Sequence, residues 1–181
     1  MIIGYVFDDG GRSESGFSGD TGDCAVRAIA IVTATPYGDV YRRMAACMKL
    51  AGYGASGNAY RQRPRRGVRP AISARRIQDL VKASYGLQPV KLARGPRPSY
   101  SEAWALHGDC VVSTSRHVAA IVAGDLRDTF DGRFYDGRLY GRGASEERKA
   151  QSVWIPTRPP GAIAGTAEFD PSILIPRPRR R

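Results

Sequence analysis

The stretch that decides the fold is residues 22–32, which read GDCAVRAIAIV. Apolar side chains occupy almost every position after Cys24, and such a segment predicts a helix that is buried on all sides. The preceding residues 8–22 are rich in glycine, serine and aspartate, which indicates a loop. Cys24 therefore stands where a loop becomes a buried helix. Free backbone N–H groups and the helix dipole favour a thiolate there, and the same N–H groups suit an oxyanion.

A second stretch, residues 115–122, reads SRHVAAIV and predicts an apolar strand that begins at His117. The chain has two histidines, and His107 lies in a sequence that favours an exposed turn after a helix. A histidine is the side chain best matched to general base work at neutral pH. We therefore expect His117 to serve as the base for a Cys24 nucleophile.

A third group should orient the imidazole, and two aspartates are candidates. A strand over residues 126–130 is expected to pair with the strand of His117 through a glycine turn near 124–125. Asp128 falls within that strand and is the first choice, with Asp131 in reserve, because the sequence does not determine the register of the turn. Polar residues upstream of the cysteine are candidates for the oxyanion or substrate site: Asp23, Ser18 and Asp20.

The order of the expected elements predicts an α+β fold in which N-terminal helices pack on an antiparallel sheet. Of the 181 residues, 42% are hydrophobic, which is enough for a core of ordinary size. We expect a single domain over residues 1–157 with an Arg-rich loop at about 53–71, and a poorly ordered Pro/Arg-rich tail over 158–181. The expected helices cover residues 23–33, 36–50, 73–85 and 99–106, and the expected strands cover 1–7, 88–92, 110–115, 117–122, 126–130, 134–140 and 152–155.

The cysteines and the N-terminus suggest a compartment. Three cysteines, at 24, 47 and 110, make a poor disulfide framework and suit a reducing environment. Residues 1–7 are too short and lack the basic flank of a signal peptide, and no apolar run is long enough to span a membrane. We therefore expect a cytoplasmic protein. Its oligomeric state is not indicated by the sequence.

The basic residues and the remaining metal-ligand types support alternative interpretations. The net charge of +11 attracts anionic partners, including nucleic acid and acidic proteins. His107, Cys110 and His117, with Cys24 or Cys47, form a competing zinc constellation, but they lack the closely paired spacing of zinc sites, so no metal is expected. A cluster of arginines is either a solvated surface or a site for an anionic partner or an acidic substrate: Arg61, Arg63, Arg65, Arg66 and Arg69.

These residues resemble a known family. Residues 22–41, GDCAVRAIAIVTATPYGDVY, are similar to the DCxxRAxAxxTxxxYxxVY segment of small phage and bacterial papain-like cysteine peptidase proteins. Residues 115–129, SRHVAAIVAGDLRDT, are similar to the histidine strand, glycine turn and Asp-Thr strand end of that group. The resemblance covers roughly residues 20–45 and 108–142. A cysteine early in the chain with its histidine far downstream is also the order of papain-like enzymes.

The resemblance implies a papain-like core with Cys24 on a central helix and His117 and Asp128 on the sheet. It also implies a cysteine-dependent peptidase, isopeptidase or amidase, or an acyltransferase variant, that acts on a protein or peptide substrate without a metal or organic cofactor. The chain departs from the pattern in one respect, since residues 12–23 contain no glutamine for the oxyanion site. Two alternatives stay open: a phage-type cell-wall amidase, and an inactive papain-like protein that binds nucleic acid or an anionic protein.

Overall fold

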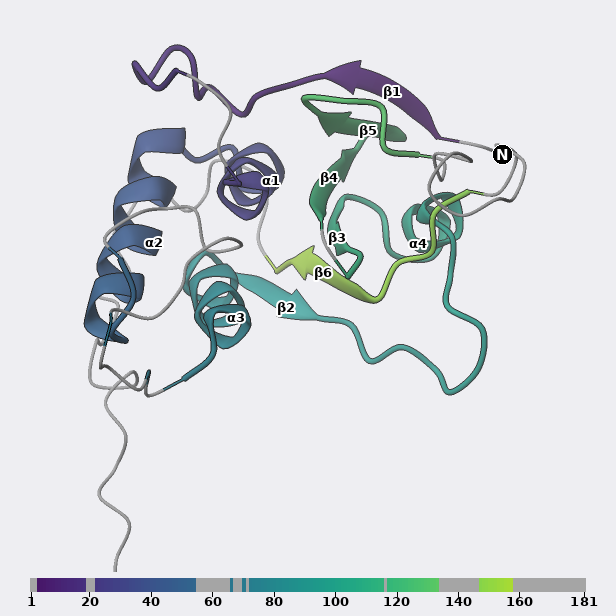
Figure 1. Ribbon diagram of the computed structural model, residues 1–181. Coiled ribbons are helices and arrows are strands. Elements are labelled where there is room, and N and C mark those ends of the chain that lie inside the picture. The colour runs from purple at the N-terminus through teal and green to yellow at the C-terminus, as the bar shows by residue number, and fades with distance from the viewer. Residues whose placement is uncertain are drawn as a thin grey trace, which may run out of the picture.

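A mixed sheet lies between two groups of helices in the computed structural model (Figure 1). The structure describes residues 3–18, 22–54, 66, 70, 72–115, 117–133 and 147–157. Within these residues six strands form one sheet in the order β1-β5-β4-β3-β6-β2. The strands are β1 (Gly4–Phe7), β2 (Leu87–Pro89), β3 (Cys110–Ser113), β4 (Val118–Val122), β5 (Asp125–Asp128) and β6 (Ser152–Pro156).

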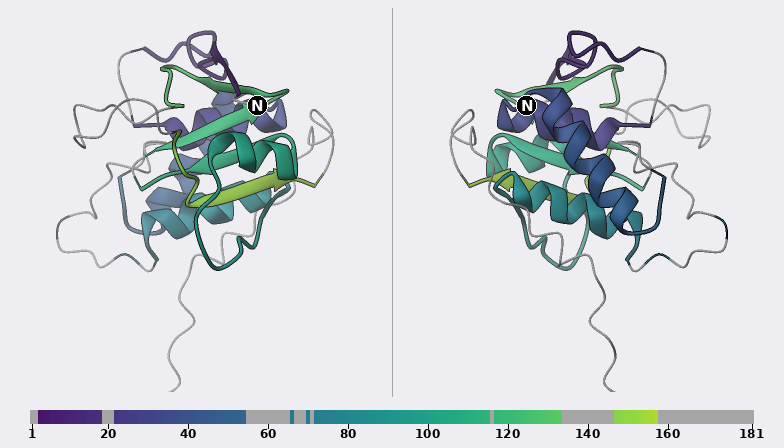
Figure 2. Two further views of the ribbon diagram at one scale, coloured as in Figure 1. Left: turned by 90° about the vertical axis from the view of Figure 1, so that its right-hand side faces the viewer. Right: turned by 90° about the vertical axis from the view of Figure 1, so that its left-hand side faces the viewer.

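Four helices cover the two faces of this sheet. They are α1 (Cys24–Thr33), α2 (Tyr37–Leu50), α3 (Ala74–Ser84) and α4 (Tyr100–His107). The first three lie on one face and α4 lies on the other, as the two side views show (Figure 2). The expected α+β class is confirmed. The sheet is mixed rather than antiparallel, because β1 runs parallel to β5 while the other neighbours are antiparallel.

Helix α1 is the centre of the larger core. Nine of its ten residues are buried, as the unbroken apolar run predicts. It packs against β4, where Val118 and Ala120 face the same cluster. The inner face of α2 is formed by Val40, Met44, Cys47 and Met48, and all four side chains are buried. This core fixes the position of the N-terminus of α1, where Cys24 lies.

The hairpin of β4 and β5 carries the second part of the site. Its turn is formed by Ala123 and Gly124, which both have positive φ angles of 54° and 82°. Positive φ at both central residues is typical of a two-residue hairpin turn, whose twist matches that of the two flanking strands. The pairing of β4 with β5 runs from Val122–Asp125 to Ala120–Arg127. His117 and Asp128 lie beyond this paired portion, at the same end of the hairpin.

Several expected boundaries are corrected. Helix α3 lies within the expected range of 73–85, and Ser73 caps it, since its hydroxyl accepts a hydrogen bond from the amide of Arg76. His107 is the last residue of α4 rather than part of a turn after it. The strands expected at 88–92, 110–115 and 126–130 are shorter and lie at 87–89, 110–113 and 125–128. The strand expected at 134–140, most of the loop at 53–71 and the tail at 158–181 lie outside the described residues.

A smaller core lies on the opposite face of the sheet. It gathers Tyr100 and Ala103 of α4 with Cys110, Ile121 and Leu126 of the strands. In the part of the chain that the structure describes, no helix has the length and apolar character needed to cross a bilayer.

Candidate active site

Cys24 is the first residue of α1, and 7% of its surface is exposed. The N-cap residue is Asp23, whose side chain makes no capping hydrogen bond to the helix. Its carbonyl oxygen accepts hydrogen bonds from the amides of Val26 and Arg27, at 2.8 and 3.1 Å. The first N–H groups of a helix have no partner within the helix. Those of Cys24 and Ala25 lie in the first turn of α1 beside the thiol and are the candidates for an oxyanion site.

His117 lies immediately before β4 and contacts two of the residues that the sequence singled out. Its Nε2 atom is hydrogen bonded to Oδ2 of Asp128. The side chain of Cys24 lies near enough to the ring to raise the pKa of His117. Because Asp128 occupies Nε2, Nδ1 is the nitrogen left for the thiol. The structure thus brings Cys24, His117 and Asp128 together at one place, with the imidazole hydrogen bonded to Asp128.

The charges around His117 favour a protonated imidazole. Burial alone would lower the pKa of His117, and 12% of its side chain is exposed. The interactions with Asp128 and with Cys24 outweigh burial and raise the pKa of His117 from 6.5 to about 9. An imidazolium at neutral pH is the partner that stabilises a neighbouring thiolate.

Asp128 is held by three groups at the end of β5. Besides His117, its carboxylate accepts hydrogen bonds from Nη2 of Arg27 at 3.4 Å and from the amide of Thr129 at 2.7 Å. Only 3% of its surface is exposed. The reserve candidate, Asp131, is exposed and forms an ion pair with Arg133 at 2.8 Å, so it does not reach the imidazole. Of the two aspartates, Asp128 is the one beside His117.

Asp23 occupies a different place from the one expected. Its carboxylate is 1% exposed and binds Arg12, Arg27 and Tyr37, at 2.9, 2.5 and 2.5 Å. Because both oxygens are engaged in a buried network, the side chain does not border a substrate site. Arg27 joins this network to Asp128. Asp23 thus helps to anchor the start of α1 relative to β5.

The other candidate residues lie away from this centre or outside the description. Ser18 is exposed, and its carbonyl oxygen accepts a hydrogen bond from Arg12. Arg66 is exposed. Asp20 and four arginines of the expected anion-binding cluster lie outside the described residues: Arg61, Arg63, Arg65 and Arg69.

The other thiols differ from Cys24 in their surroundings. Cys47 lies in the larger core and Cys110 in the smaller one, and each is at most 1% exposed. Burial raises the pKa of Cys47 to about 11 and that of Cys110 to about 12, so both are protonated at neutral pH. Among the described residues, no group of three histidine, cysteine, aspartate or glutamate side chains could hold a metal ion.

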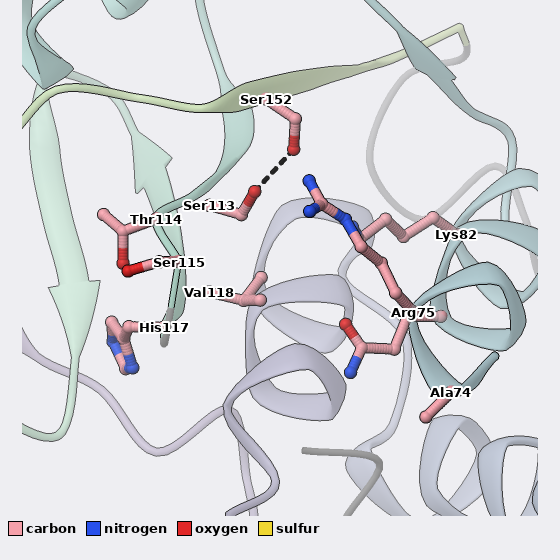
Figure 3. Close-up of a pocket in the computed structure, with 10 residues that line it drawn as sticks. Ala74, Arg75, Lys82, Ser113, Thr114, Ser115, His117, Val118 and Ser152 are labelled. Atoms are coloured by element: carbon pink, nitrogen blue, oxygen red, sulfur yellow. Dashed lines mark hydrogen bonds between the residues drawn. The ribbon is translucent and has the colours of Figure 1, made fainter.

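A cavity of about 200 Å³ opens beside His117 (Figure 3). Helix α3 contributes three polar side chains to it, from Arg75, Gln78 and Lys82. These three residues were not among the site candidates that the sequence suggested. The available signal was their spacing of three and four residues, which places them on one side of a helix. The remaining walls come from β3, β6 and the segment before β4.

Phe130 covers part of the imidazole. Its ring centroid lies 4.7 Å from that of His117, and 45% of the residue is exposed. This contact shields the hydrogen bond between His117 and Asp128 on one side.

No protein-family model, curated protein or solved structure matches this chain.

Proposed function

We propose that the protein is a cysteine-dependent hydrolase of the peptidase, isopeptidase or amidase type, with a papain-like arrangement of its site. The observation that supports this most directly is that the imidazole of His117 is hydrogen bonded to Asp128 and lies near enough to Cys24 for the thiol to raise its pKa. A nucleophile, a base and a group that orients the base are the three parts of such a site. Here they come from a helix start, a strand start and a strand end.

In the first half of the reaction, the thiolate of Cys24 attacks the carbonyl carbon of an amide. The carbonyl π electrons move to the oxygen, and the amides of Cys24 and Ala25 are the donors available to the resulting oxyanion. The imidazolium of His117 then gives its proton to the nitrogen. The C–N bond breaks, the amine leaves, and an acyl-enzyme on Cys24 remains.

In the second half, neutral His117 takes a proton from water, and the hydroxide attacks the acyl carbon. The C–S bond breaks, and Cys24 leaves as a thiolate that pairs again with the imidazolium. Asp128 is a positioning residue in this scheme, because it holds Nε2 and stabilises the protonated ring. An amine in place of water would make the same acyl-enzyme a transferase intermediate.

Acyl-enzyme formation can be tested before a natural substrate is identified. Incubation with p-nitrophenyl acetate should release p-nitrophenolate in a burst and add one acetyl group to Cys24, located by peptide mass spectrometry. Iodoacetamide at pH 7 should likewise label Cys24 before Cys47 and Cys110, whose thiols are buried and protonated. His117→Ala should slow both reactions.

Two variants make this test specific. Cys47→Ser removes a thiol of the same core without touching the site, and it should leave the burst unchanged. Cys24→Ser should abolish it. Equal labelling of the three cysteines, or unchanged Cys24 reactivity in His117→Ala, would contradict the proposed function.

A further inference from the structure

Polar side chains line the cavity beside His117 from two sides, and the charged ones on α3 are cations. Helix α3 presents Arg75, Gln78 and Lys82, at spacings of three and four residues. Opposite them, β3 and β6 present the hydroxyls of Ser113 and Ser152, which are hydrogen bonded to each other at 2.5 Å. In Figure 3 the side chains of Arg75 and Lys82 extend from α3 toward this serine pair, and His117 lies at the opposite side. No aspartate or glutamate is among the described residues that line the cavity.

Lys82 is the unusual member of this lining. Its side chain is 3% exposed, although lysine is almost never buried without a partner. An ammonium group has three N–H donors, and Lys82 forms one long ion pair within its helix, from Nζ to Oδ1 of Asp79 at 3.5 Å. Its other contact is with the ring of Trp154, whose centroid lies 4.8 Å from Nζ. Burial lowers the pKa of Lys82, and Asp79 offsets this only in part. The buried cation therefore has donor capacity left for an anion.

Arg75 and Gln78 add further donors. Arg75 is exposed at the side of the cavity, and Gln78 is 8% exposed. Neither side chain forms a hydrogen bond or an ion pair with another residue in the described ranges. A guanidinium binds a carboxylate through two parallel hydrogen bonds, and such charge-assisted bonds are stronger than neutral ones. Two cations, an amide and two hydroxyls thus converge on a space that His117 also borders.

We propose that this cavity binds the carboxylate of an acidic substrate residue, so that the enzyme prefers aspartyl or glutamyl groups on the acyl side of the attacked bond. The proposal rests on the proposed function for the chemistry of the bond, but the cavity itself is formed by residues other than Cys24. Arg75 and Lys82 are the specificity-determining residues. Because His117 lines the cavity, an acyl-side residue next to the attacked carbonyl is near enough to place its side chain there.

A matched pair of alkylating reagents tests this preference. Acetyl-glutamyl and acetyl-glutaminyl chloromethyl ketone differ by a carboxylate against an amide, and both transfer their carbon to a thiolate with loss of chloride. The glutamyl reagent should alkylate Cys24 about tenfold faster, the factor expected of one charge-assisted hydrogen bond. The ratio of the two rates is the measured quantity, because a change in thiol reactivity alone cancels from it.

Variants of α3 identify the residues that are responsible. Arg75→Gln and Lys82→Met should each reduce the ratio toward one, and Arg75→Glu should bring it below one. Arg76→Gln is the matched control, since Arg76 is the exposed neighbour on the same helix and does not line the cavity. It should keep the ratio of the unmodified protein. A ratio of one in the unmodified protein, with His117-dependent labelling of Cys24, would overturn the cavity proposal and leave the hydrolase intact.

A binding measurement separates the cavity from the chemistry. In a Trp104→Phe background, the fluorescence of Trp154, which contacts Lys82, should respond to glutarate but not to glutaramide. Arg75→Gln should weaken this response. This result would support the cavity even if Cys24 proved unreactive and the proposed function failed. A response to inorganic phosphate without one to glutarate, or no response to either anion, would overturn the carboxylate site.

Discussion

Nη2 of Arg27 lies 3.4 Å from Oδ1 of Asp128, while Nη1 of the same guanidinium lies 2.5 Å from Oδ1 of Asp23. One buried cation therefore joins the residue before Cys24 to the residue that holds His117. The distance between the nucleophile and its base is thus supported by two routes. One is the packing of α1 on β4, and the other is this ion-pair network.

The network predicts a large stability effect for Arg27. Arg27→Met leaves a similar volume but removes the cation between two carboxylates that are 1% and 3% exposed. Removing one partner of a buried ion pair leaves an uncompensated charge, so the free energy of unfolding should fall by about 3 kcal/mol. Urea unfolding followed by circular dichroism measures this difference.

The exposed ion pair of Arg42 with Asp39 provides the control. Arg42→Met should change the free energy of unfolding by less than about 1 kcal/mol, as for other surface pairs. Equal effects of the two substitutions would show that the buried network does not contribute to stability as described.

The second prediction concerns the titration of His117. His107→Gln leaves a single histidine, so the remaining imidazole signal in the proton NMR spectrum belongs to His117. Its midpoint should lie near pH 9, because the hydrogen bond to Asp128 and the interaction with Cys24 stabilise the protonated ring. Asp128→Asn removes a negative charge and should lower this midpoint toward 6.5. A midpoint near 6.5 in the presence of Asp128 would contradict the hydrogen-bonded arrangement.

The raised pKa of His117 also makes the stability of the folded state depend on pH. The folded-state pKa of about 9 lies above the unfolded value of 6.5, so the bound proton stabilises the folded state. This contribution is fully present below pH 6.5 and is lost as the pH rises through about 9. Activity that requires the imidazolium should decline over the same alkaline range.

The sequence predicted those parts of the fold in which one local pattern of residues determines the structure. The apolar run after Cys24 predicted a buried helix, and Ser73 predicted a helix start, because burial and capping depend on neighbouring residues. The parallel pairing of β1 with β5 was not predictable in this way, since it joins residues more than a hundred positions apart.

The residues of the candidate site were likewise predictable where a local pattern decides and not where distant contacts decide. Cys24 and His117 could be chosen from the boundaries of their elements. The choice of Asp128 over Asp131 depended on where the hairpin pairing ends, and the sequence did not determine that register. The buried position of Lys82 was not predictable, because it arises from the ring of Trp154, which packs against α3 from a distant strand.

A third prediction follows from strain at the hairpin turn. Ala123 is exposed and has a φ of 54°, a conformation that costs an alanine about 1 kcal/mol. Ala123→Asn creates the Asn-Gly pair preferred in such turns and should raise the free energy of unfolding by up to about 1 kcal/mol. Ala105→Asn, at an exposed position within α4, should instead lower it by a few tenths of a kcal/mol, since asparagine is the poorer helix former. A loss of stability in Ala123→Asn would contradict the turn conformation.

The last prediction compares two truncations at the C-terminal side of β6. The Pro/Arg-rich composition of residues 158–181 predicts a poorly ordered tail with few core residues, so deletion of 160–181 should leave the melting temperature nearly unchanged. Thr157, by contrast, is bonded to the carbonyl oxygen of Gly86 through its amide at 2.9 Å and its hydroxyl at 2.8 Å. Deletion of 157–181 removes both bonds and should cost about 1–2 kcal/mol. In calorimetry this corresponds to a fall of several degrees for a domain of this size. A comparable fall in the shorter deletion would show that the segment after residue 159 packs on the domain.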